Sequence, residues 1–130
     1  MKALLDKAES SSIVNMISIS GYIGPIGYST YCSAKRAVDP LTKSLALELA
    51  PKVRINAIAP GWIETPFKVE GLEKSTDPIK YRRDVEALHA WQRVATPEEI
   101  AKSIYWMSSK DSSFMTESVV IVDGGYMIEN

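Results

Sequence analysis

Cysteine and histidine are scarce in this 130-residue sequence, which has one of each, Cys32 and His89. A single cysteine cannot form a disulfide within the chain, and one cysteine with one histidine is too few for a Cys/His metal site. We therefore expect no metal. Cys32 is expected to be a small packed side chain, and His89 a packing or surface residue.

Charge of one sign and long apolar runs are also scarce. The 15 Lys and Arg and 16 Asp and Glu residues give a formal net charge of -1, with no block of like charges. That balance argues against a nucleic-acid partner or a membrane surface. No run reaches the roughly 18 apolar residues of a spanning helix, and residues 1–7 do not resemble a signal peptide. We expect one cytoplasmic domain over 1–130.

Three short runs rich in Ile and Val, at 13–17, 53–58 and 119–122, are the predicted strands. They do not alternate apolar and polar residues, which is typical of strands buried on both faces of a parallel sheet. Long segments with helical character separate them, as parallel pairing requires. The expected fold class is therefore α/β, with about three parallel strands and flanking helices.

The clearest predicted helix covers 29–50 and ends at Pro51. Its apolar stripe consists of Ala34, Val38, Leu41, Leu45 and Leu49. Pro40 falls on the opposite face, where an internal proline favours a helix that curves convex outward. We also expect a short helix near 81–88 and a helix that begins at a capping box of Thr96 and Glu99. Core or lid packing is expected of three residues: Trp62, Trp91 and Trp106.

Tyr31 and Lys35 lie four positions apart in the first predicted helix, which places both side chains on one face. A phenol holds its proton until about pH 10, and a nearby ammonium favours the phenolate. The pair can therefore act as a general acid or base. Taken alone, the same spacing is also typical of an amphipathic helix whose Tyr packs and whose Lys is solvated.

The sequence around this pair supports the chemical interpretation. Ser18 lies thirteen positions before Tyr31, in NMISISG at 15–21. Downstream stand KSLALELA at 43–50, RINAIAPG at 54–61, Thr65, RVATPEEIA at 93–101 and VDGG at 122–125. In order and spacing this set resembles the short-chain dehydrogenase/reductase family over nearly the whole chain. The similarity is to members of the 3-oxoacyl-carrier-protein reductase and glucose dehydrogenase type.

The resemblance implies an NAD(P)-dependent oxidoreductase that interconverts an alcohol and a carbonyl, with NAD or NADP as cofactor. Ser18 would hydrogen-bond the substrate oxygen, and Tyr31 would be the general acid or base. Lys35 would favour the phenolate of Tyr31, and both residues would contact the cofactor. The segment that would lie along the nicotinamide contains Pro60, Gly61, Ile63 and Thr65, with the Ile63 backbone and the Thr65 hydroxyl holding the carboxamide.

Two local alternatives accompany these assignments. Ser20 would point to the same face as Ser18 if the strand continued, and only the family spacing to Tyr31 and Gly21 selects Ser18. The glycines at 21, 24 and 27 are spaced G-x-x-G-x-x-G, which does not match the dinucleotide-binding pattern G-x-G-x-x-G. We interpret them as a loop beside the active site.

The sequence also departs from the family pattern. The Gly-rich turn of the dinucleotide-binding half, the Asn-Asn-Ala-Gly motif and the catalytic Asn are missing, and residues 2–8 resemble the tail of the helix that carries that Asn. We therefore expect a single partial Rossmann-type domain, the catalytic and substrate-loop half, with an exposed edge at 13–17. Alone it should bind cofactor weakly and turn over little.

The expected partners are a small alcohol or carbonyl substrate and either a second copy of the chain or a complementary amino-terminal half. In the family the helix equivalent to 29–50 often packs against its copy in a dimer, and Pro40 on its outward face argues against that contact. The alternative hypothesis is a truncated, non-catalytic remnant or a binding and oligomerisation module. The sequence does not distinguish NAD from NADP, and it does not identify the substrate.

Overall fold

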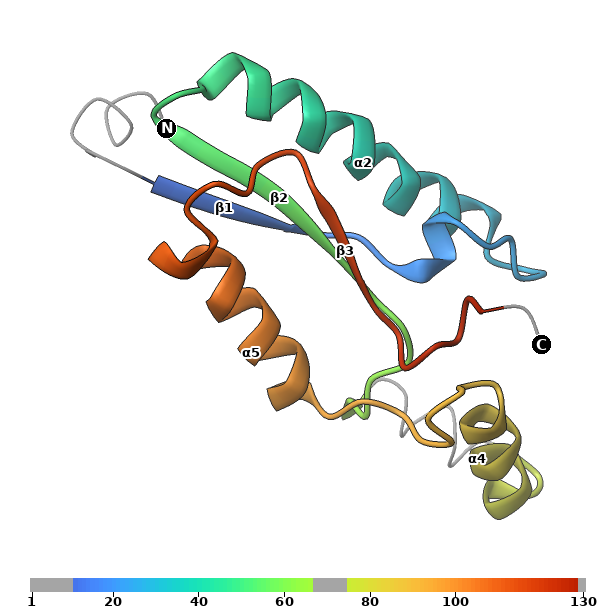
Figure 1. The fold of residues 1–130 in the computed structure, drawn as a ribbon. Helices are drawn as coiled ribbons and strands as arrows, with labels where there is room; N and C mark the ends of the chain where they lie inside the picture. The colour runs from blue at the N-terminus through green and yellow to red at the C-terminus, as the bar shows by residue number, and fades with distance from the viewer. Residues whose placement is uncertain (1–10, 67–74, 129–130) are drawn as a thin grey trace.

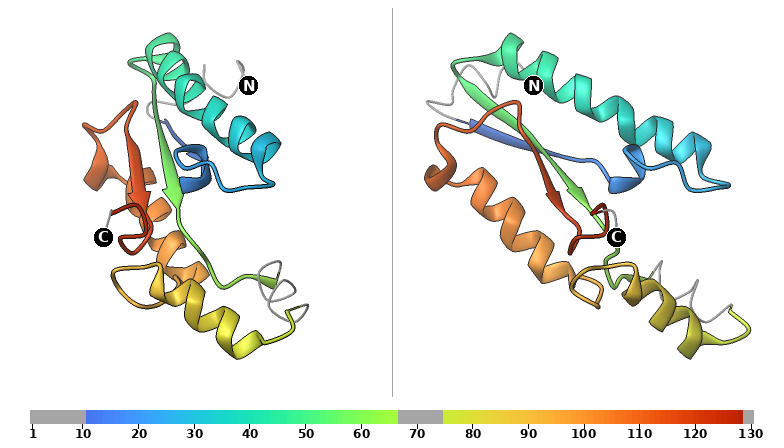
Figure 2. Two further views of the ribbon diagram at one scale, coloured as in Figure 1. Left: turned by 90° about the vertical axis from the view of Figure 1, so that its right-hand side faces the viewer. Right: turned by 45° about the vertical axis from the view of Figure 1, so that its right-hand side comes forward.

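The protein is described by a computed structural model, which covers residues 11–66 and 75–128. One parallel sheet has the order β1-β2-β3, formed by β1 (Ser11–Met16), β2 (Val53–Pro60) and β3 (Val119–Val122). The crossovers contain α2 (Ser29–Leu49), α4 (Pro78–Ala87) and α5 (Pro97–Ser108). Helices α2 and α5 cover opposite faces of the sheet (Figures 1 and 2). The predicted α/β fold with three parallel strands is confirmed.

The core lies on both faces of the central strand, β2. Ile55 packs with Ala46 beneath α2, and Ile58 packs with Ile100 beneath α5. Ile55 and Ile58 are fully buried. A strand with helices on both faces needs apolar residues at consecutive positions, which explains why this segment does not alternate.

The buried face of α2 differs from the predicted stripe. Leu41 is 51% exposed, whereas Thr42 and Asp39 are buried. The Thr42 hydroxyl donates to the Val38 carbonyl at 2.7 Å and accepts from the Asn15 amide at 3.0 Å. Because these bonds satisfy its polar group, Thr42 can take a core position that the apolar pattern assigned to its neighbour.

The remainder of α2 corrects one prediction and agrees with another. Ala34, also assigned to the stripe, is exposed. The Asp39 carboxylate lies 3.3 Å from the Arg36 guanidinium and 3.2 Å from the Lys43 ammonium, which compensates its burial. Pro40 is exposed, on the outward face as predicted.

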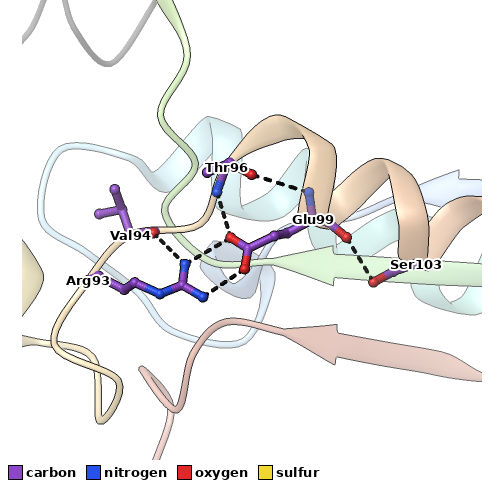
Figure 3. Close-up of polar contacts among 5 residues, drawn as sticks. All are labelled: Arg93, Val94, Thr96, Glu99 and Ser103. Carbon is purple, nitrogen blue, oxygen red and sulfur yellow. Dashed lines mark hydrogen bonds and ion pairs between the residues drawn. The ribbon is translucent and has the colours of Figure 1, made fainter.

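The helices of the second crossover begin at side-chain caps. The Asp77 carboxylate accepts from the Lys80 amide at 2.9 Å, so α4 begins three residues before the predicted start. The predicted capping box of α5 is confirmed: the Thr96 hydroxyl accepts from the Glu99 amide at 3.3 Å, and the Glu99 carboxylate accepts from the Thr96 amide at 2.9 Å (Figure 3).

Polar side chains of β2 fix the end of α5 and the start of β3. The Arg54 guanidinium donates to the carbonyls of Met107, Ser109 and Met115 at 3.0–3.3 Å. These bonds satisfy carbonyls at and beyond the last turn of α5, which have no intrahelical partner. The Asn56 amide donates to Met115 at 2.9 Å, and its oxygen accepts from Ser118 at 3.1 Å.

Within 11–66 and 75–128, β1 is an edge strand that pairs only with β2, as expected for the 13–17 segment. The expected helix tail at 2–8 lies outside the described residues. No helix in the described ranges is both long and apolar enough to cross a membrane.

Candidate active site

A pocket of about 570 Å³ lies at the carboxyl ends of β1 and β2. All seven site residues predicted from the sequence line it: Ser18, Tyr31, Lys35, Pro60, Gly61, Ile63 and Thr65. They come from two segments, 18–35 and 60–65, which follow the neighbouring strands β1 and β2. The parallel topology therefore brings the predicted residues together at one edge of the sheet.

Tyr31 and Lys35 lie in the first two turns of α2, which begins beside the end of β1 (Figure 1). The Lys35 ammonium lies 5.8 Å from the centroid of the Tyr31 ring and donates to the Met16 carbonyl at 3.2 Å. This bond connects the ammonium to the last residue of β1. Tyr31 is 45% exposed, so its ring is accessible from the pocket.

Ser18 follows the end of β1 and caps the short 3-10 helix η1 (Ile19–Gly21). Its hydroxyl oxygen accepts from the Ser20 amide at 3.2 Å. Both serines line the pocket, but the strand ends at Met16, so the alternation expected for a continued strand does not apply. The two hydroxyls instead have different backbone settings, a cap for Ser18 and a helical turn for Ser20.

Hydrogen bonds on both sides hold the segment after β2. Gly61 donates its amide to Val122 at 3.0 Å, and a Cβ at Gly61 would lie 2.9 Å from the Asp123 Cα, too close for a side chain. Ile63 forms a parallel bridge with Ala95. The segment therefore cannot move away from the pocket without breaking contacts to β3 and to the turn before α5.

The loop with three glycines lies beside the pocket, as predicted. Ile23, Pro25 and Tyr28, all from this loop, line the pocket. Gly27 has a φ of +86°, a conformation that other residues rarely adopt. Gly21 packs against the Arg36 backbone of α2, where a Cβ would lie 3.1 Å from the Arg36 nitrogen. Gly27 thus serves the turn, and Gly21 the close packing against α2.

Besides Tyr28 of the glycine loop, three aromatic residues that line the pocket were not predicted as site residues: Trp62, Tyr81 and Tyr126. Trp62 was expected in the core or a lid, and it contacts Tyr81 of α4 edge-on at 6.4 Å. Tyr126 stands just beyond β3, and residues after a parallel strand belong to the ligand-binding edge of the sheet. Its position after a predicted strand could therefore have identified Tyr126 as a pocket residue from the sequence.

The other tryptophans are not core residues. Trp91 is 71% exposed with the Arg93 guanidinium 5.3 Å from its ring, and Trp106 is also exposed. His89, by contrast, is buried, which agrees with a packing role.

Tyr22, which precedes α2, contacts a buried carboxylate of that helix. Burial and the nearby Asp39 carboxylate raise the pKa of Tyr22 above its ordinary value. The Tyr22 hydroxyl donates to that carboxylate at 3.4 Å. Tyr22 is therefore held in its protonated form and is unsuited to proton transfer at neutral pH, and it does not line the pocket.

A family model described as enoyl-(acyl carrier protein) reductase matches residues 1–127. This chain belongs to the short-chain dehydrogenase/reductase family. Among relatives in this family, a cyclohexanol dehydrogenase of Acinetobacter sp. (strain SE19) is 41% identical over 120 residues, covering 92% of this chain and 44% of the relative. A 3-oxoacyl-(acyl-carrier-protein) reductase of Thermotoga maritima is 37% identical over 123 residues, covering 94% and 48%.

Solved structures of short-chain dehydrogenases show the same fold. The ligand-free aldohexose dehydrogenase of Thermoplasma acidophilum matches with a TM-score of 0.90 at 34% identity, over 98% of this chain and 51% of its own. ElxO with NADP bound matches with a TM-score of 0.85 at 33% identity, over 98% and 50%. This short-chain dehydrogenase/reductase chain thus spans about half the length of the relatives that it matches.

Proposed function

We propose that this chain carries the catalytic half of an NAD(P)-dependent oxidoreductase that interconverts an alcohol and a carbonyl. The observation that carries the proposal is the meeting of Ser18, Tyr31 and Lys35 in one pocket, with the ammonium of Lys35 beside the ring of Tyr31. The pair alone would fit an ordinary amphipathic helix. An amphipathic helix alone would not explain why a serine at the end of β1 and the segment after β2 line the same pocket, whereas a reaction site needs such groups close together.

The residues present fit a nicotinamide cofactor. Pro60, Gly61 and Ile63 offer an apolar wall held by contacts on both sides, with the Thr65 hydroxyl at its end. A planar ring with one amide suits such a wall, and the Lys35 ammonium can donate to ribose hydroxyls. When bound, the cofactor supplies the hydride for carbonyl reduction or accepts it in alcohol oxidation.

The chain's own groups position the substrate oxygen and move its proton. The Ser18 hydroxyl donates a hydrogen bond to that oxygen and holds the carbon toward the cofactor wall. In reduction the Tyr31 phenol gives its proton to the oxygen as the carbon gains the hydride. In oxidation the phenolate takes that proton back. The adjacent Lys35 cation stabilises the negative charge on Tyr31 between these steps.

A second candidate is a binding or oligomerisation module that keeps the family motifs without turnover. The edge of β1, whose partner among the described residues is β2 alone, favours this candidate, because an open strand edge can pair with another chain. A complementary amino-terminal half or a second copy would supply that strand. We also propose that the cofactor is NAD or NADP and that the protein is cytoplasmic.

The first experiment is a titration of the chain with NADH and NADPH, followed by tryptophan fluorescence, because Trp62 lines the pocket. Lys35→Ala should weaken binding about tenfold or more, the usual effect of losing hydrogen bonds to a charged group. The control is Lys102→Ala, which removes an exposed ammonium from α5. Equal binding by Lys35→Ala and the unmodified chain contradicts the proposal. No binding of either cofactor at millimolar concentration favours the second candidate.

A further inference from the structure

We propose that the pocket takes a neutral, largely apolar alcohol or ketone, and that Tyr81 and Tyr126 are specificity-determining residues. This inference rests on the proposed function and adds the substrate class to it. The side chains around the pocket carry it, because they decide which groups a substrate can bury there.

The first step is the charge of the pocket lining. Among the described residues the lining contains no carboxylate and no guanidinium, and its one cation is Lys35. The Lys35 ammonium already donates to the Met16 carbonyl and lies over the Tyr31 ring. A carboxylate elsewhere on a substrate would therefore meet apolar groups and neutral hydroxyls, which do not compensate its lost hydration.

The second step is the chemical character of the lining outside the proposed cofactor segment. Ile23, Pro25 and Tyr28 come from the glycine loop, and Tyr81 comes from α4. Aromatic rings and branched aliphatic side chains bind apolar ligand surface without directional demands. The groups that the proposed reaction uses are the Ser18 and Tyr31 hydroxyls and the Lys35 ammonium, all in the lining. One oxygen on an otherwise apolar substrate matches these groups.

The third step is the rigidity of Tyr81. Its ring contacts Trp62 edge-on at 6.4 Å. One position further along α4, the Arg82 guanidinium forms an ion pair with Glu64 at 3.0 Å and thereby connects the helix to the segment after β2. The Asp77 cap fixes the start of the same helix. Tyr81 is thus held over the pocket by contacts at both its ring and its backbone.

The fourth step is the position of Tyr126. The Asp123 carboxylate accepts from the amides of Gly125 and Met127, each at 2.9 Å, and so fixes the turn that carries Tyr126. The ring of Tyr126 packs edge-on against His89 at 5.2 Å. His89 is only 2% exposed, and its Nδ1 lies 2.9 Å from the Val85 carbonyl of α4. Tyr126 therefore forms a wall supported from both sides.

The test measures ligand binding without cofactor, by saturation-transfer NMR on the chain. The probes are cyclohexanone and 4-oxocyclohexanecarboxylate, which share a ring and a carbonyl and differ by one negative charge. We expect cyclohexanone to bind about tenfold or more tightly. Equal or tighter binding of the carboxylate overturns the inference, and so does failure of cyclohexanone to bind at millimolar concentration.

Variants distinguish the contribution of the Tyr81 and Tyr126 rings from effects of a substitution on folding. Tyr126→Ala and Tyr81→Ala should each weaken cyclohexanone binding several-fold, whereas Tyr126→Phe should keep it, because the ring makes the wall. The matched control is Tyr105→Ala, which removes an exposed tyrosine from α5. Circular dichroism identifies any variant that fails to fold, and Tyr81→Ala and Tyr126→Ala lie on different elements, so one can replace the other. Unchanged binding in both folded alanine variants overturns the assignment.

The two proposals fail in different ways. Cyclohexanone binding without any NADH or NADPH binding would leave the substrate class standing and remove the oxidoreductase function from the chain. Cofactor binding that depends on Lys35, without cyclohexanone binding, would support the oxidoreductase function and overturn the proposed substrate class.

Discussion

Lys35 makes two contacts, because its ammonium donates to the last residue of β1 and lies beside the Tyr31 ring. The hydrogen bond to the backbone holds the ammonium close to the phenol ring. A general acid or base needs this kind of fixed electrostatic neighbour, since proton transfer depends on the stability of both protonation states. The proximity of these two side chains could be predicted from the sequence, because Tyr31 and Lys35 share one helix.

Tyr31→Phe tests the proton-transfer role directly. The substitution removes one hydroxyl and keeps the ring, so cofactor binding should persist while turnover falls about 100-fold or more. The measurement is NADH or NADPH oxidation with cyclohexanone, alongside the fluorescence titration. Tyr28→Phe, which removes another hydroxyl from the pocket lining, is the matched control and should retain turnover. Retained turnover in Tyr31→Phe would assign the proton to another group.

Gly61 shows how backbone spacing positions the proposed cofactor wall. A methyl group at Gly61 would lie 2.9 Å from the Asp123 Cα, so the backbone must shift. Gly61→Ala should therefore destabilise the fold by about 1–3 kcal/mol, a typical cost of overpacking. Gly24→Ala is the control, because a Cβ there meets nothing within 4 Å. Urea denaturation measures both, and equal stability of the two variants would contradict this account.

Sequence reasoning was less successful for the pocket wall. Tyr81 and Tyr126 lie about fifty and ninety-five positions after Tyr31, and neither belongs to a motif used to identify the site. Their convergence depends on where α4 and the turn after β3 lie in space. Local spacing carries no information on that placement, whereas the strand-end position of Tyr126 does.

At the scale of elements, the hydrogen bonds and ion pairs of polar side chains determine which face of a helix is buried and where a helix begins, and apolar periodicity alone does not show this. The apolar stripe on α2 predicted the helix correctly but placed its buried face at the wrong angle. Thr42 and Asp39 are buried with polar partners, whereas Leu41 is exposed. The beginning of α5 was predicted correctly, since a capping box is a local signal written in four consecutive residues. The Asp77 cap of α4 is equally local, and a search for it would have placed that start.

The cap of α5 also makes stability depend on pH. The Arg93 guanidinium donates to both oxygens of the Glu99 carboxylate at 2.7 and 2.8 Å (Figure 3). These bonds, followed by the one from the Thr96 amide, lower the pKa of Glu99 from its ordinary 4.5 to about 2. A lowered carboxyl pKa contributes stability that is fully present above pH 4.5 and is lost as the pH falls toward 2.

We expect Glu99→Gln to lower stability at neutral pH and to reduce the loss between pH 4.5 and pH 2. Denaturant melts of both proteins across this range measure the difference. Glu98→Gln is the control, because Glu98 lies in the same helical turn and forms no capping box. A pH dependence that is unchanged in Glu99→Gln would show that other carboxyl groups control acid sensitivity.

At the scale of the whole molecule, the parallel arrangement of the strands was predictable and the completeness of the sheet was not. Buried apolar runs separated by helical crossovers indicated parallel strands, and the register between β1 and β2 then brought Ser18 and the segment after Pro60 to one edge. What pairs with the outer edge of β1 depends on chain or copies beyond the described residues. The chain spans about half the length of the relatives that it matches.

Amide hydrogen exchange can report on that edge residue by residue. The amides of Ser11 and Ile17 donate to carbonyls of Lys52 and Ile58 at 3.1 and 2.8 Å. Since parallel strands alternate their amide directions, Ile13 and Asn15 also face β2, whereas Val14 and Met16 face the outer edge. In β2, Val53–Ile58 pair with β1 and Ala57–Pro60 pair with β3, so strands lie on both sides at Ala57 and Ile58.

We therefore expect alternating protection in β1, and protection of both neighbouring amides at Ala57 and Ile58 in β2. Val14 and Met16 should exchange about tenfold or more faster than Ile13 and Asn15, because they lack a hydrogen-bonded partner in the described chain. Two-dimensional NMR at several protein concentrations provides the measurement. If exchange at Val14 and Met16 becomes slower as the protein concentration rises, a second copy of the chain is paired with β1. Slow exchange at every concentration would contradict the open edge, and with it the reason to expect a partner strand.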